Sequence, residues 1–99
     1  MYATVRESTI TSGNEERAAP RLQEFWQLRA RQPGYRGNVT VDAGEGRSLI
    51  LTLWDSEEQA TAARRVLEPE GERLMGDLRA SPSRILGEGT VRQDDLSRA

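Results

Sequence analysis

The segment of residues 48–54, SLILTLW, constrains the fold more than any other part of the chain. Nearly every residue in it is apolar or β-branched, which is typical of a strand buried on both faces. It follows a turn at residues 43–46, AGEG, whose glycines suit the positive φ values of a hairpin. Residues 35–41 precede this turn and alternate in character, with Val39 and Val41 on one face. The sequence therefore predicts a hairpin whose second strand is the hydrophobic centre of the protein.

The segments before the hairpin predict a strand followed by a helix. Residues 2–10 are rich in β-formers and are expected to form the first strand. The helix is expected to begin near residues 17–19, because Pro20 is tolerated only in a first turn, and to end near Pro33. Its apolar face is marked by spacings of three and four residues. The side chains at these spacings are Ala18, Leu22, Phe25, Trp26 and Arg29.

After the hairpin, a second helix is expected from residue 56 to about residue 67. Asp55 and Ser56 supply capping chemistry, and acidic residues occupy the first turn. Pro69 and Gly71 are expected to interrupt this helix. Three further segments follow: a short helical piece at 72–79, a loop at 81–83 and a last strand at 84–91.

This order, β-α-β-β-α-β, predicts an α+β, ferredoxin-like fold, a four-stranded antiparallel sheet with both helices on one face. We expect a single domain over residues 1–92 and a polar C-terminal tail at 93–99. One face of such a sheet stays bare, although residues 48–54 point apolar side chains both ways. A second copy would bury that face, so we predict a homodimer through the sheet. Whether Ile50 or Leu51 meets the partner is left open.

The composition excludes many functions. A formal net charge of −2 gives no sign of a nucleic-acid or anionic-membrane partner, and no apolar run approaches the ~20 residues that span a bilayer. The absence of cysteine favours a cytoplasmic location. All 14 basic residues are arginine and there is no histidine, which rules out histidine acid–base catalysis, His or Cys zinc sites and Schiff-base lysines. No metal or cofactor is predicted.

The central stretch also resembles a known family. QPGYRG at residues 32–37 and LILTLWDSEEQATAA at residues 49–63 are similar to the PG-(aromatic)-x-G … WxSEEA pattern of the antibiotic-biosynthesis monooxygenase-like group. That group belongs to the dimeric α/β-barrel superfamily, and the order of elements agrees with it over residues 2–91. The resemblance implies that two ferredoxin-like protomers pack their sheets into a barrel, with a pocket between each sheet and its own helices.

The resemblance also implies a choice of activities. Some members oxidise polycyclic phenols to quinones with molecular oxygen and no cofactor, whereas others degrade haem through an axial histidine and a tryptophan on the second helix. This chain has no histidine, and the tryptophan's place falls near Ala63, so a haem role is not expected. Trp54 matches the family's strand-end tryptophan. No tyrosine on the second helix matches the one found in the monooxygenases.

Five residues are predicted to bind a substrate, although each has an ordinary structural reading. Trp54, Trp26 and Met75 are expected to bound the cavity, and packing in the core is the alternative. Asn38 lies on the polar face of its strand, where it forms hydrogen bonds with a ligand, forms them at the dimer interface, or is solvated. Arg6 lies inside the first strand, where it either holds an anionic group or forms an interchain ion pair. No catalytic residue is identified.

Two functions remain from different classes. One is a small enzyme, an oxygenase or a related cyclase or isomerase, acting on an aromatic or polyketide-like molecule. The other is a non-catalytic dimeric module that binds a hydrophobic small molecule or only assembles. Two other proteins share the topology. An RNA-binding domain is disfavoured by the acidic composition, and an acylphosphatase is disfavoured by the acidic segment TSGNEE at residues 11–16.

Overall fold

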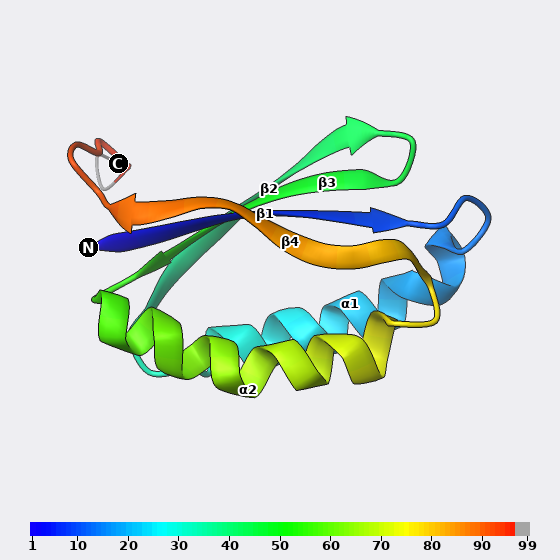
Figure 1. Ribbon diagram of the computed structural model, residues 1–99, viewed down its shortest axis with the longest axis horizontal. Coiled ribbons are helices and arrows are strands. Elements are labelled where there is room, and N and C mark those ends of the chain that lie inside the picture. The colour runs from blue at the N-terminus through cyan, green and yellow to red at the C-terminus, as the bar shows by residue number, and fades with distance from the viewer. Residues whose placement is uncertain (97–99) are drawn as a thin grey trace.

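The computed structural model describes residues 1–96 and has the predicted ferredoxin-like architecture (Figure 1). The four strands form one antiparallel sheet in the order β2-β3-β1-β4, and both helices lie beneath it. Part of the predicted tail, residues 97–99, lies outside the described residues. The elements are β1 (Tyr2–Ile10), α1 (Glu15–Ala30), β2 (Tyr35–Gly44), β3 (Arg47–Trp54), α2 (Glu57–Met75) and β4 (Arg79–Thr90).

Strand alternation decides which side chains of the sheet face the helices. β3 pairs with β2 on one side and β1 on the other, so it is central, as the sequence predicts. Thr52 and Trp54 are buried, at 5% and 3% exposure, which places the even-numbered residues of β3 under the helices. Ile50 therefore faces the helices and Leu51 faces the opposite side. Leu51, rather than Ile50, is thus on the face that the helices leave open.

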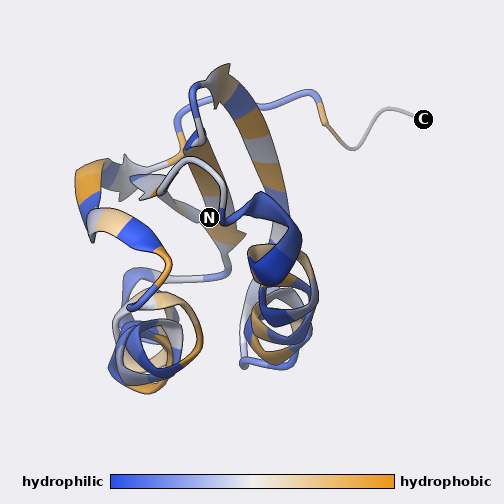
Figure 2. Cartoon of the chain, turned by 90° about the vertical axis from the view of Figure 1, so that its right-hand side faces the viewer, coloured by the Kyte–Doolittle hydropathy of each residue, from blue (hydrophilic) through white to orange (hydrophobic). Residues whose placement is uncertain are grey.

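The opposite face of the sheet is apolar and open. Leu51 pairs in register with Val39, and Leu49 pairs with Val41. The two valines are 48% and 51% exposed. In the end-on view of Figure 2, both helices lie on one side of the sheet. The described chain thus leaves a row of aliphatic side chains uncovered.

The expected interruption of the second helix is wrong, because α2 runs unbroken from Glu57 to Met75 with Pro69 inside it. Pro69 lacks an N–H and so removes one helical hydrogen bond. Buried apolar residues anchor both halves of the helix, Leu67 in the cluster around Trp54 and Leu74 in the cluster around Leu78. Gly71 lets α1 approach closely, since a Cβ there would lie 3.3 Å from Cε1 of Phe25.

Two further expectations are corrected. The segment at residues 81–83 is not a loop but part of β4, which pairs with β1 along most of its length. Pro82 is tolerated there because β4 is an edge strand and its register with β1 is irregular at this point. Helix α1 begins at Glu15, before the expected start at 17–19, because the Asn14 carbonyl already accepts a hydrogen bond from the Ala18 N–H at 2.9 Å.

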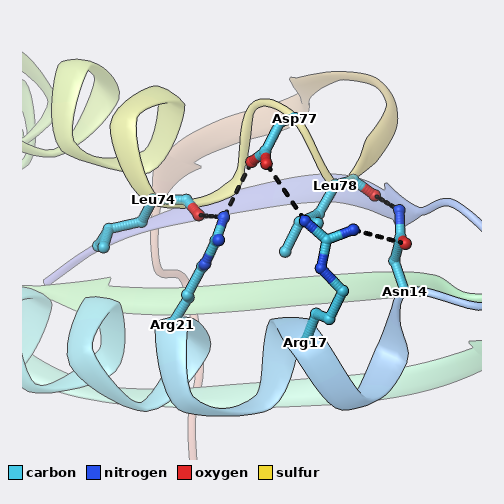
Figure 3. Close-up of polar contacts among 6 residues, drawn as sticks. All are labelled: Asn14, Arg17, Arg21, Leu74, Asp77 and Leu78. Carbon is cyan, nitrogen blue, oxygen red and sulfur yellow. Dashed lines mark hydrogen bonds and ion pairs between the residues drawn. The ribbon is translucent and has the colours of Figure 1, made fainter.

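Polar contacts hold the start of α1 against the turn between α2 and β4 (Figure 3). Arg21 donates to the Leu74 carbonyl at 3.2 Å and to an Asp77 carboxylate oxygen at 2.9 Å. Arg17 lies 3.7 Å from the other oxygen of the same carboxylate. These contacts flank a small buried cluster that includes Ala18 and Leu74. A second buried cluster, centred on Trp54, lies at the other end of the helices, and Phe25 packs against both.

Candidate functional site

A cavity of about 370 Å³ lies between the sheet and the two helices. Its ceiling is the helix-facing side of β1 and β3, where strand alternation aligns Thr4, Arg6, Thr52 and Trp54. Residues of α1 and α2 form the other walls, and Ser83 of β4 lies at one side. The cavity volume falls in the ordinary range for small-molecule sites, roughly 300–1,000 Å³.

Aromatic side chains form one end of the cavity. Trp54 ends β3 and is followed by Ser56, whose hydroxyl accepts the Gln59 N–H at 3.2 Å and so caps α2. The Trp54 ring packs edge-on to Tyr35, with ring centroids 5.8 Å apart. Trp26 of α1 also lines the cavity, yet it is 42% exposed, so it stands at the opening. An aromatic ligand would meet indole rings here.

The polar groups of the cavity are dominated by arginine. Four arginines and two glutamates line it, a formal charge of +2 in a chain whose formal net charge is −2. Three of the arginines have carboxylate partners: Arg6, Arg64 and Arg79. Arg6 lies 3.8 Å from Glu68 and also donates to the Ser83 hydroxyl at 3.2 Å. Burial lowers the pKa of Arg6, and the nearby Glu68 opposes this shift.

Arg64 and Arg79 are held by glutamates at the edges of the cavity. Arg64 donates to Glu88 at 2.8 Å, and Tyr2 donates its hydroxyl to the same carboxylate oxygen at 2.9 Å. These two hydrogen bonds lower the pKa of Glu88, with the Arg64 bond the larger cause. Arg79 lies 3.7 Å from Glu72, and burial lowers the pKa of its guanidinium.

Arg29, the fourth arginine, differs from the other three. It is 8% exposed, and among residues 1–96 no carboxylate lies within ion-pair distance of it. Its Nε is buried without a hydrogen-bond partner, as is the Nε of Arg79. Burial lowers the pKa of Arg29, and Tyr35 beside it acts in the opposite direction. A buried guanidinium without an anion is unusual, because desolvating a charge is costly.

The structure brings together four of the five residues predicted to bind substrate. Arg6, Trp26, Trp54 and Met75 all line the cavity. Asn38 does not. It lies in an adjoining open hollow of about 310 Å³, which it shares with Trp26 and Arg29. That these residues bind a ligand stays a prediction.

The Asn38 side chain is already engaged within the sheet. Its amide donates to the Leu51 carbonyl at 3.0 Å and to the Thr52 hydroxyl at 2.8 Å. Its carbonyl oxygen accepts the Thr40 hydroxyl at 2.8 Å. Asn38 therefore has little free hydrogen-bonding capacity to offer a ligand.

Sequence reasoning missed Arg29, Arg64 and Arg79 as cavity residues. Arg29 carried a signal, because it continues the apolar face of α1 that begins at Ala18, and an arginine on such a face needs an explanation. Arg64 and Arg79 carried none, since their neighbours come from distant parts of the chain.

Residues 1–96 contain neither a candidate metal site nor a candidate membrane-spanning helix. No group of three or more His, Cys, Asp or Glu side chains there is arranged to hold a metal ion. Within the same residues no helix is long and apolar enough to cross a membrane.

Comparison with known proteins supports the fold. No family model and no curated protein sequence matches the chain. A protein of unknown function from Nitrosomonas europaea matches in structure with a TM-score of 0.80 and 15% identity, over 99% of this chain and 95% of its own. SnoaB, a cofactor-independent oxygenase from Streptomyces nogalater, matches with a TM-score of 0.73 and 18% identity, over 94% of each chain.

A third solved structure, a proposed antibiotic biosynthesis monooxygenase from Nitrosomonas europaea, matches with a TM-score of 0.76 and 14% identity, over 94% of this chain and all of its own. The chain therefore shares the fold of antibiotic biosynthesis monooxygenase-like proteins, as the resemblance in the sequence implied. Identities this low establish the fold and leave the chemistry to the site.

Proposed function

We propose that the cavity binds an electron-rich aromatic small molecule and that the protein oxidises it with molecular oxygen, without metal or organic cofactor. The observation that carries this proposal is the cavity itself, which combines about 370 Å³ of space, indole walls and an excess of arginine. Indole walls favour a flat ring, and arginines favour the anion that such a ring becomes when it loses a hydroxyl proton. The fold shared with SnoaB, a cofactor-independent oxygenase, supports the same reading.

The proposed reaction converts a phenol and O₂ into a quinone and water. One oxygen atom forms a C=O bond at a ring carbon, the C–H bond there breaks, and the phenolic oxygen becomes the second carbonyl. The other oxygen atom leaves as water with the two protons that the substrate loses. The substrate supplies all four electrons, so no external reductant is required.

The protein's part in this reaction is binding and electrostatics. Arginines beside the ring would lower the pKa of the phenol and hold the phenolate, which is the form that gives an electron to O₂. The walls of the cavity would exclude bulk water, which strengthens these interactions. The chain needs no residue that itself becomes oxidised or reduced.

A second candidate is binding without turnover, and the titratable groups of the cavity favour it. The chain has no histidine or cysteine, and the two carboxylates that line the cavity belong to Glu68 and Glu72. Both side chains are well exposed, at 55% and 71%, and both lie near arginines. An exposed carboxylate paired with an arginine is a weak candidate for a general base, so the phenol would have to lose its proton to water.

We further propose that the protein is a homodimer formed through the open face of the sheet. Five aliphatic side chains line the two strands there, and the two valines among them are about half exposed. A second copy of the same face is the complement that symmetry makes available. The residues are Val39, Val41, Leu49, Leu51 and Leu53.

The test combines ligand binding with oxygen uptake. Metal-free protein is incubated with polycyclic phenols such as 1-naphthol, and dissolved oxygen and products are followed by electrode and mass spectrometry. The proposal expects products with one oxygen atom gained and two hydrogens lost. Trp26→Ala should weaken binding, whereas Val66→Ala, at an exposed position outside the cavity, should not. Binding without oxygen uptake would favour the second candidate, and no binding by any phenol would contradict both.

A further inference from the structure

Arg29 carries a positive charge that no carboxylate of residues 1–96 balances. The side chain lies near the C-terminal end of α1 and lines both the cavity and the adjoining hollow. It is 8% exposed, its Nε has no hydrogen-bond partner, and within residues 1–96 no carboxylate pairs with it. Each of the other three cavity arginines has a glutamate within 4.0 Å.

A guanidinium cannot escape this position by losing its proton, because its pKa lies far above neutrality. The charge therefore persists in a poorly solvated place, at a cost in stability. An anion brought by a ligand would balance it. The cavity that Arg29 lines provides the volume for such a ligand, and Trp54 and Trp26 provide flat apolar surface on the same cavity.

We propose that Arg29 binds a carboxylate group carried by an aromatic ligand, so that the preferred ligands of this cavity are aromatic carboxylic acids. The inference rests on the proposed function, in that the same cavity is the ligand site. The two Nη groups of a guanidinium form a fork of N–H donors that matches the two oxygens of a carboxylate. The Nε of Arg29 is itself buried, so the Nη groups would make this contact.

The surroundings of Arg29 suit this role. Tyr35 lies beside its guanidinium and packs edge-on to Trp54, so the aromatic wall reaches the charge. Asn38, in the adjoining hollow, spends its amide on Thr52 and the Leu51 carbonyl and does not compete for the ligand. The ring would lie against the indoles and the carboxylate would point toward Arg29.

The test uses two probes that differ in charge and little else, 2-naphthoate and 2-naphthamide. Each is titrated at fixed ionic strength into ¹⁵N-labelled full-length protein, and binding is followed by NMR, including the Arg29 side-chain Nε–H signal. The variants are Arg29→Met, which keeps the apolar stem, and Arg29→Lys, which keeps the charge and loses the fork. Arg31→Met is the matched control, because Arg31 is an exposed arginine of the same helix end.

The wild-type protein should bind naphthoate at least 10-fold more tightly than naphthamide, and naphthoate alone should shift the Arg29 Nε–H signal. Arg29→Met should weaken naphthoate binding by about 10- to 100-fold and leave naphthamide unchanged, which also shows that the cavity is intact. Arg29→Lys should fall between, and Arg31→Met should match the wild type.

Equal binding of the two probes by the wild type, or an unchanged preference for naphthoate in Arg29→Met, would overturn the role of Arg29 and leave the proposed function standing. Failure of both probes to bind would overturn this inference, and with it the proposal that the cavity is an aromatic ligand site.

Discussion

Replacing Arg29 by methionine should stabilise the ligand-free protein, although it removes a residue that packs in the interior. Arg29 is 8% exposed and its Nε has no partner, so the folded state carries a desolvation cost that the unfolded state does not. Exchanging buried charges for apolar residues of similar size is often neutral or stabilising by about 1–4 kcal/mol. Tyr35 beside the guanidinium offsets part of the cost. We therefore expect a gain of about 1–3 kcal/mol.

For a domain of 99 residues, each 1 kcal/mol raises the melting temperature by roughly 4–8 °C, so a gain of about 1–3 kcal/mol should raise it by about 4–24 °C. The assay is thermal and urea unfolding at pH 7 and one fixed protein concentration, because association would make the midpoint concentration-dependent. Arg31→Met, at an exposed site, should change stability by less than about 0.5 kcal/mol. A loss of stability in Arg29→Met, with Arg31→Met unchanged, would refute the reasoning, because it would mean that the Arg29 charge is compensated within the fold.

Three further predictions concern the sheet, the helices and the carboxylates. Light scattering should give the molar mass of a monomer for Leu51→Glu and that of a dimer for Val66→Glu, which lies on the outer side of α2. A dimeric Leu51→Glu variant would contradict association through the sheet. Gly71→Val should lower the free energy of unfolding in urea by about 1–3 kcal/mol, because a Cβ added there would lie 3.3 Å from a ring atom of α1; wild-type stability would show that the helices separate freely. The pKa of Glu88 is lowered, chiefly by Arg64, so its contribution to stability is present above the unfolded pKa, near 4.3, and is lost as the pH falls through the lower folded pKa. Glu88→Gln should therefore flatten the dependence of stability on pH below about pH 5, and an unchanged slope would contradict this.

The hairpin of β2 and β3 was predictable because its signals are local. Alternation in residues 35–41, a glycine turn and an apolar run are enough to specify a hairpin, and the structure has it as β2 and β3. The continuity of α2 was not predictable in this way. Pro69 is a strong local signal for a break, and it is overridden by Leu67 and Leu74, which pack on the same side of the helix. Tertiary packing decides that competition, and no local pattern reports it.

The candidate site was likewise predictable only in part. Trp54 and Met75 could be placed at the cavity from strand and helix periodicity, because each lies on the inward face of its element. The lack of an ion-pair partner for Arg29 could not be predicted, because the carboxylates that could pair with it would come from distant parts of the sequence. Asn38 shows the reverse limit. It lies on the face opposite Val39 and Val41, as the alternation predicts, but its hydrogen bonds with Thr40 and Thr52 occupy the amide.

Under the proposed role of Arg29, ligand binding changes the stability of the folded protein. Apolar residues make up 35% of the chain, which limits what burial alone can contribute to a domain of this size. In such a domain, a guanidinium that is 8% exposed and has no carboxylate partner lowers the stability of the folded state. Ligand binding can offset that cost. A ligand that neutralises Arg29 would stabilise the folded state twice, by its own burial against the indoles and by ending the desolvation cost of the charge. An aromatic acid should therefore raise the free energy of unfolding more than its neutral amide does. Arg29→Met should remove this difference, because the variant is already more stable without a ligand and the acid has no charge left to neutralise.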